Sequence, residues 1–162
     1  MQTTCCIECA FAYVKQQKEK REEDKKKEAR KALREYKKND KPILLQLAQK
    51  LVNQYARKRD EKERGKVCCT CGQTTGQMDG GHFLPTSTYG SIRFNTNQIF
   101  QQCKKCNRFN GGMPKEYRIF MIDRYGVEYV EKLESTKGEL RRYTVEYYTK
   151  LIRVVRKKIK NI

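Results

Sequence analysis

Two short cysteine pairs constrain the fold of this chain more than any other feature of its sequence. Cys68 and Cys71 form one C-x-x-C pair, Cys103 and Cys106 form a second, and 31 residues, 72 to 102, lie between them. Pairs at this separation are typical of a zinc site with four thiolate ligands, because each pair presents two sulfurs to one face of a tetrahedron. Two disulfides are the alternative, but residues 1–9 show no signal-peptide pattern that would direct the chain to an oxidising compartment. We therefore expect these four cysteines to bind a structural Zn²⁺.

The segment between the pairs contains the one histidine of the chain, His82, which follows Asp79 closely. Four thiolates already complete a tetrahedral zinc site, so the histidine is available for chemistry. Asn97 lies between His82 and the second pair, and Asn107 follows the last cysteine directly. A histidine can accept a proton near neutral pH, and carboxylate and amide oxygens suit a hard cation such as Mg²⁺. Together these residues predict a site for phosphodiester hydrolysis.

This order of residues in a C-x-x-C frame resembles the HNH endonucleases, whose ββα-metal core binds one catalytic divalent cation beside the scissile phosphate. The last position of the motif holds Asn107 in place of His. His82 would then be the general base, and Asp79 and Asn107 would hold a catalytic Mg²⁺ or Mn²⁺. Asn97 would have a framework role, holding the loop that carries His82 through hydrogen bonds. Arg93 could steady the scissile phosphate by a bidentate contact.

Three segments make the chain resemble more closely the phage lambda NinG (Rap) family of recombination proteins. In chain order these segments are Asp79-Gly80-Gly81-His82, Arg93-Phe94-Asn95 and Gln102-Cys103-Lys104-Lys105-Cys106-Asn107. The likeness is specific over roughly residues 48–134, of which 114–134 resemble the family's downstream helices. The family's activity implies branched DNA, such as Holliday junctions or D-loops, as substrate. It also implies phage or host recombination proteins as partners and the bacterial cytoplasm as location. Because such junctions have two-fold symmetry, a homodimer is expected.

Other interpretations exist for the same residues. A zinc module that binds DNA and positions recombination proteins without cutting would use His82 only structurally. A redox-switched thiol protein is a further alternative. Asp79 could cap a turn, and Arg93 could form a surface ion pair. We favour the nuclease because Asp79, His82, Asn97 and Asn107 occur together.

Charge points to the class of partner. The chain carries 37 Lys and Arg against 19 Asp and Glu, a net charge of +18. This excess predicts a polyanionic partner, because each basic side chain that neutralises a phosphate releases condensed counterions. A membrane surface is less favoured, since the basic segments lack a large apolar face and no apolar run approaches the roughly 20 residues of a membrane span. With 37% hydrophobic residues and no Trp, the core must be small, so a bound zinc would contribute folding free energy.

The N-terminal part, residues 1–41, reads as a charged arm. Cys6 and Cys9 resemble the latter half of a family zinc knuckle whose upstream half is missing from this sequence. An incomplete knuckle is favoured, but ordinary thiols or a metal shared by two copies stay open, as does the state of Cys5. Lys15–Glu28 contains no apolar residue, which predicts a solvated helix or a fraying arm that serves as a spacer or a DNA tether.

The first strand of a hairpin is expected at Gln77–Phe83. A glycine pair within a strand often marks a bulge, and a bulge at Gly80-Gly81 would let Asp79 and His82 point to one side. Without a bulge, the alternation of a strand would place them on opposite faces. The returning strand is expected at Ile92–Phe94.

The second knuckle is expected at Asn97–Cys106, opening into a helix that carries Asn107. Apolar residues at intervals of three and four predict further helices. One begins near Pro42 and ends at Gly65, one begins at Pro114 and ends at Gly126, a short one follows, and one covers Thr144–Ile162. Arg57, Lys58 and Arg59, near the end of the first of these helices, are expected to face solvent.

The predicted fold class is α+β and mostly helical. A small treble-clef or ββα-metal zinc module, a β-hairpin plus a helix, would be flanked by long charged N-terminal helices and by C-terminal helices. Three segments are expected: the arm (1–41), the zinc module with its flanking helices (42–134) and a basic amphipathic helix (135–162). The last helix would contact DNA phosphates through Arg153, Arg156 and Lys157, and its apolar stripe would seal the core or a dimer.

Overall fold

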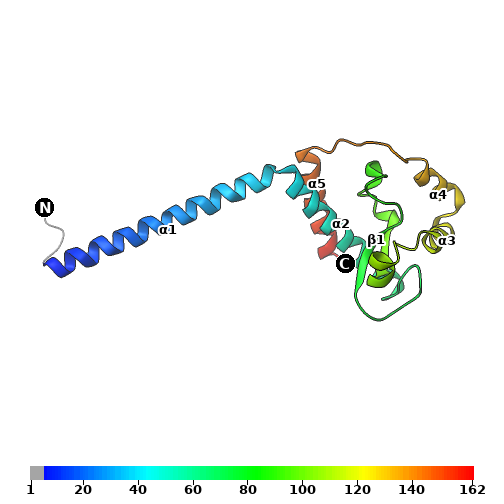
Figure 1. Cartoon of the computed structure of the whole chain (residues 1–162), viewed down its shortest axis with the longest axis horizontal. Helices are drawn as coiled ribbons and strands as arrows, with labels where there is room; N and C mark the ends of the chain where they lie inside the picture. Colours follow the sequence, from blue (N-terminus) through cyan, green and yellow to red (C-terminus); the bar gives the residue numbers. More distant parts are fainter. Residues whose placement is uncertain (1–5) are drawn as a thin grey trace. The chain divides into compact units, whose positions relative to one another are not determined.

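The computed structural model describes residues 6–162, and these form two units that divide between Asp40 and Lys41. The N-terminal unit contains the long helix α1 (Ile7–Asn39) (Figure 1). None of the residues of α1 is buried. The Cys6 side chain caps this helix by accepting a hydrogen bond from the Cys9 N–H, at 3.4 Å. Cys5 lies outside the described residues. Lys15–Glu28, which contains no apolar side chain, is therefore part of a solvated helix, one of the two states that its composition predicts.

The C-terminal unit is built on α2 (Lys41–Arg64), which packs along α5 (Val145–Lys160) (Figure 1). Asp40 is in an extended conformation and separates α2 from α1, and Gly65, with φ of +76°, ends α2. The core between the two helices contains a stripe of buried apolar side chains from each: Leu44, Ala48, Val52 and Ala56 of α2, and Tyr148, Ile152 and Val155 of α5. The predicted helix limits near Pro42 and Gly65 are confirmed, and the apolar stripe of α5 packs on the body of its own chain.

One antiparallel hairpin lies against α2. Its strands are β1 (Met78–His82) and β2 (Ile99–Cys103), paired residue for residue from Met78–Cys103 to His82–Ile99. A side chain at position 80 would place its Cβ 2.7 Å from the Asn53 carbonyl oxygen of α2. Only glycine permits so close a contact of strand and helix. Across residues 6–162 the protein is thus mostly helical with a small two-stranded sheet.

The returning strand and the bulge were predicted wrongly. Ile92–Phe94 is not a strand, because Ile92 closes the short 3-10 turn η1 (Gly90–Ile92). The strand is Ile99–Cys103, within the segment expected to be the second knuckle, and it follows a further 3-10 turn, η2 (Thr96–Gln98). The unbroken pairing leaves no bulge at Gly80-Gly81. The alternation of the strand therefore places Asp79 and His82 on opposite faces of β1.

A second core lies between the hairpin and two further helices, α3 (Pro114–Tyr125) and α4 (Val127–Glu134). Gly126, with φ of +83°, separates these helices as predicted. Tyr117 is fully buried; its hydroxyl accepts a hydrogen bond from the Phe100 N–H at 3.0 Å and donates to the Gly81 carbonyl at 2.9 Å. This hydroxyl therefore joins α3 to both strands.

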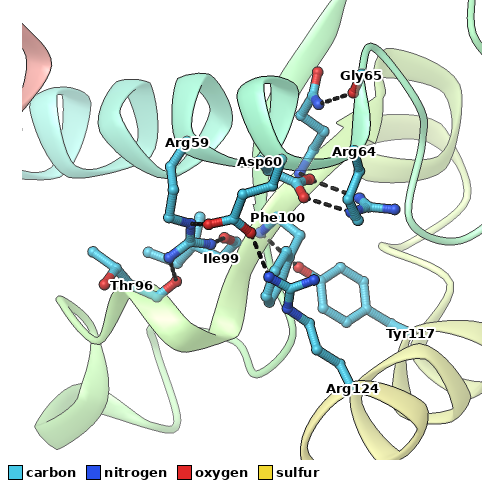
Figure 2. Close-up of polar contacts among 11 residues, drawn as sticks. Arg59, Asp60, Arg64, Gly65, Thr96, Ile99, Phe100, Tyr117 and Arg124 are labelled. Carbon is cyan, nitrogen blue, oxygen red and sulfur yellow. Dashed lines mark hydrogen bonds and ion pairs between the residues drawn. The ribbon is translucent and has the colours of Figure 1, made fainter. Parts of the chain in front are cut away.

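Buried polar contacts tie the end of α2 to β2 (Figure 2). Asp60 is fully buried and accepts hydrogen bonds from the Arg64 guanidinium, at 2.6 and 2.7 Å, and from the Gln101 N–H, at 2.8 Å. Arg59 donates to the carbonyls of Thr96 and Ile99, at 3.1 and 3.2 Å. The prediction that Arg59 faces solvent is therefore wrong, since it holds the start of β2. Within residues 6–162, no helix combines the length and the apolarity that crossing a membrane requires.

Candidate metal centre and active site

The two cysteine pairs meet in one cluster. The sulfur atoms of Cys68, Cys71, Cys103 and Cys106 all lie within 4.8 Å of one another. The first pair lies in the loop after α2, and the second joins the end of β2 to the π-helical turn η3 (Lys105–Phe109). The hairpin therefore brings together pairs that are distant in sequence.

The local backbone turns around both cysteine pairs and directs N–H groups at their sulfur atoms. Gly72, with φ of +73°, lets the chain turn so that its N–H bonds the Cys68 carbonyl at 3.0 Å. Backbone N–H groups point at the sulfurs: that of Cys103 at the Cys68 Sγ (3.2 Å) and that of Cys106 at the Cys103 Sγ (3.5 Å). Such donors favour the thiolate form that a metal requires.

The cluster fits a tetrahedral metal such as zinc. Zn–S bonds of about 2.3 Å imply sulfur–sulfur distances of about 3.8 Å in a tetrahedron, and the Cys71 and Cys103 sulfurs are 3.8 Å apart. Burial alone would raise the pKa of the Cys68 thiol, but hydrogen bonds from Thr70 and from the Cys103 amide lower it to about 6. Cys69 is outside the cluster, and burial raises the pKa of its thiol. His82 is outside it as well.

His82 ends β1 and is held by its ring nitrogen Nε2. This atom lies 3.2 Å from the Arg93 carbonyl oxygen and 3.2 Å from the Gln49 side-chain amide. Because a carbonyl oxygen can only accept, Nε2 carries the proton when it bonds to Arg93. In that tautomer the Gln49 amide nitrogen, itself a donor, contacts the ring without bonding to it and donates to the Asn53 side chain at 2.8 Å. In the neutral ring, Nδ1 is then the atom with a free lone pair. Burial lowers the pKa of His82 to about 4, and the positive charge of Arg93 acts in the same direction. The imidazole is therefore neutral at pH 7.

The environment of His82 can be tested by NMR, because the chain has a single histidine and gives one imidazole signal. We expect this signal to titrate far below pH 6.5, near pH 4, with the proton of the neutral ring on Nε2. In urea the same signal should titrate near the ordinary value of about 6.5. Between these two pH values the unfolded chain binds more protons, so acid should lower the stability of the fold over that window. Titration near pH 6.5 in the folded protein would contradict this placement.

Asp79 lies on the opposite face of β1 and is held by the turn η3. Its carboxylate accepts two hydrogen bonds from Arg108, at 2.7 and 3.2 Å, and one from the Asn107 side-chain amide, at 3.2 Å. Burial opposes ionisation, but these hydrogen bonds keep the pKa of Asp79 below its ordinary value. The carboxylate is therefore charged, and a cation bound there would compete with Arg108.

The structure brings together only part of the predicted catalytic set. Asn107 lies on η3, where a helix was predicted, and contacts Asp79 directly. Asn107 also lines a cleft of about 470 Å³ together with His82, Thr86 and Gly112. Asn107 therefore contacts Asp79 on one face of β1 and lines the cleft beside His82 on the other. This cleft is the candidate active site.

Asn97 does not hold the loop that carries His82, whereas Arg93 lies beside this loop. Asn97 is exposed, and its side chain makes no hydrogen bond to any of the described residues. Gln98 holds the loop after His82 instead, accepting from the Leu84 N–H at 3.2 Å and donating to the Ile92 carbonyl at 2.8 Å. Arg93 donates to the Thr86 carbonyl at 3.3 Å, so it also supports this loop. The residues proposed to bind DNA on α5, Arg153, Arg156 and Lys157, are all exposed.

Sequence reasoning missed Gln49, Gln98, Asp60 and Arg108. Arg108 follows Asn107 directly, and this adjacency could have indicated its role. Gln49 contacts His82, and Gln98 and Asp60 form hydrogen bonds to distant segments. Only the fold brings these groups together, so no local pattern marked them.

Comparison with known proteins gives the family. A family model described as Bacteriophage Lambda NinG protein matches residues 1–162. Protein ninG of Escherichia phage lambda is 38% identical over 100 residues, which cover 61% of this chain and 47% of that protein. Protein ninG of Salmonella phage P22 is 35% identical over 112 residues, covering 64% of this chain and 54% of that protein. The matched part spans about half the length of these relatives. No solved structure matches the chain. Because the family model covers residues 1–162, the chain belongs to the NinG family of bacteriophage proteins.

Proposed function

We propose that this protein is a metal-dependent DNA endonuclease of the HNH type that acts in phage recombination. The observation that carries the proposal is the state of His82: a neutral imidazole outside the thiol cluster, held through Nε2, lining a cleft with Asn107. In this state the free Nδ1 could take a proton from water. The hairpin β1–β2 followed by η3 would correspond to a treble-clef or ββα-metal module.

The proposed reaction is hydrolysis of a phosphodiester. His82 would take a proton from water through Nδ1 while the water oxygen bonds to phosphorus and the bond to the leaving oxygen breaks; the leaving oxygen would take a proton from solvent. The Asp79 carboxylate and the Asn107 amide oxygen would hold Mg²⁺ or Mn²⁺, which would stabilise the charge on the phosphoryl group. A phosphate, like a carboxylate, accepts two parallel N–H bonds. DNA could therefore draw Arg108 away from Asp79.

We propose the substrate and the assembly from the resemblance to the recombination proteins of this family. Branched DNA, such as a Holliday junction or a D-loop, would be the substrate, and the host cytoplasm would be the location. A homodimer would place two active sites on a two-fold junction, and other recombination proteins would be partners.

A second function is a zinc-containing module that binds DNA and assists recombination without cutting it. The bidentate pair between Asp79 and Arg108 favours this alternative, because the carboxylate that would bind the catalytic cation is already engaged. The two functions differ in whether the wild-type protein cuts DNA.

A cleavage assay distinguishes the nuclease from the accessory protein. A labelled four-way junction and a linear duplex of the same sequence are each incubated with the protein and Mg²⁺ or Mn²⁺. We expect His82→Ala to lower the nicking rate by about 10²–10⁴-fold, the usual contribution of a general base, with junction binding retained. His82→Asn keeps a hydrogen-bonding side chain that cannot act as a base, so it should be equally slow. Zinc content and binding serve as controls for folding. Wild-type protein that binds junctions but cuts with neither metal would support the accessory role.

A further inference from the structure

A basic cleft runs along the face of α2 that does not pack on α5. The cleft has a volume of about 720 Å³, and its far wall is formed by residues 76–80 and by Arg108. The α2 residues that line it recur at intervals of three and four and so share one face of the helix: Lys50, Asn53, Gln54, Arg57 and Glu61. The apolar stripe of the same helix points into the core, so the amphipathic pattern of α2 itself produces this polar wall.

Charge in the cleft is unevenly balanced. Four cationic side chains line it, Lys50, Arg57, Lys66 and Arg108, against two acidic ones, Glu61 and Asp79. Each acid is matched by one arginine: Arg57 lies 3.5 Å from Glu61, and Arg108 lies 2.7 Å from Asp79. Among the described residues, Lys50 and Lys66 form no ion pair, and both are exposed. The cleft thus presents two uncompensated cations, which is the condition for attracting a polyanion.

The cleft continues towards His82. A neighbouring hollow, lined in part by Gln49, Thr86 and Arg93, shares Lys50 and Asn53 with it. Thr86 in turn lines the cleft beside His82. A chain of phosphates that lay against Lys66 and Lys50 could therefore pass Arg93 and reach the imidazole.

We propose that the cleft along α2 binds the sugar-phosphate backbone of DNA and directs one strand to His82. The choice of DNA as the polyanion rests on the proposed function, whereas the position of the binding surface rests on the charges and walls described above. This surface differs from the exposed basic face of α5, because no α5 residue lines it.

Equilibrium binding tests the proposal without cleavage. A fluorescent four-way junction and a linear duplex would be titrated with Lys50→Ala/Lys66→Ala protein in buffer without divalent cations, over a range of salt concentrations. Counterion release predicts a loss of roughly an order of magnitude in affinity for each lost phosphate contact near 0.1 M salt. The slope of log K against log salt should also shrink by about two.

A matched double variant separates position from net charge. Lys132 and Lys137 are exposed lysines outside the cleft, so Lys132→Ala/Lys137→Ala removes the same charge elsewhere. We expect this control to keep the salt slope of the wild type, and bound zinc would confirm the fold of both variants. Equal losses in the two doubles would overturn the proposal, because only net charge would then matter.

The basic face of α5 supplies a second comparison. If Arg153→Ala/Arg156→Ala lowers the salt slope while the cleft variant does not, α5 is the binding surface and the proposal fails. These outcomes are independent of catalysis. A protein that binds through the cleft and never cuts would leave this inference standing while the nuclease assignment failed. If cutting requires His82 but binding does not require Lys50 and Lys66, the nuclease assignment stands and this inference fails.

Discussion

Cys103→Ser protein is expected to lose its bound metal and to unfold around the hairpin. Cys103 ends β2, and its sulfur contacts both the Cys71 sulfur and the Cys106 amide. Without the metal, no metal–sulfur bond joins the loop after α2 to the turn η3, and three thiols and the new hydroxyl are left side by side. Structural zinc contributes about 10–16 kcal/mol of apparent binding free energy in zinc-finger peptides. A typical domain has only about 5–15 kcal/mol of stability in total.

The measurement should follow the tertiary structure of residues 41–162. α1 has no buried residue, so its helical signal need not change when the C-terminal unit unfolds. Tyrosine fluorescence or NMR dispersion, together with zinc content, reports on the right part of the molecule. We expect one zinc per chain in the wild type and loss of both metal and tertiary signals in the Cys103→Ser variant, as after treatment with a chelator.

Cys69→Ser is the matched control, because Cys69 neighbours the cluster without belonging to it. It should keep the metal. If Cys103→Ser protein retains stoichiometric zinc and its full stability, the four-thiol metal site is wrong.

Asp60→Ala is expected to destabilise the C-terminal unit by about 3–5 kcal/mol, the usual cost of removing one partner from a buried ion pair. Asp60 is fully buried, and its carboxylate satisfies both the Arg64 guanidinium and the Gln101 N–H (Figure 2). The substitution leaves these donors unpaired and removes the contact that holds the middle of β2 to α2. Urea unfolding of the metal-loaded protein, followed by tyrosine fluorescence, would measure the loss.

A surface pair of the same chemistry provides the control. Arg118 and Glu134 also form two hydrogen bonds, at 2.8 and 3.1 Å. Their side chains, however, are 41% and 31% exposed. Glu134→Ala should therefore cost only about 0–1 kcal/mol. Similar losses for the two variants would show that the burial of Asp60 contributes nothing to the free energy of unfolding, contrary to this prediction.

Helix limits could be predicted from the sequence because their signals are local. Pro42, Gly65, Pro114 and Gly126 mark starts and stops that the structure confirms within one or two residues. The spacing within and between the two C-x-x-C pairs is also visible in the sequence, so the four-sulfur cluster could be predicted without the fold.

The returning strand could not be predicted in the same way. The sequence of β2 is Ile-Phe-Gln-Gln-Cys, and all five residues are buried. The strand therefore lacks the alternation of apolar and polar residues by which a half-buried strand is predicted. The side-chain amide nitrogens of the buried Gln101 and Gln102 donate to the carbonyls of Gly65 and Gly112, at 2.9 and 2.6 Å. Those partners lie 36 and 10 residues away along the chain. A buried polar residue looks like a loop residue until its distant partner is known.

The sequence by itself predicted the four-cysteine cluster that could hold a metal, the helix limits and the place of the single histidine, since these depend on residue type and short spacing. Only the tertiary structure decided that Asp79 and His82 lie on opposite faces of β1, that Arg108 engages Asp79, and that Gln98 supports the loop where Asn97 was expected to do so. The reason is physical. Strand register and the pairing of buried polar groups are set by contacts between segments that the chain brings together only when it folds.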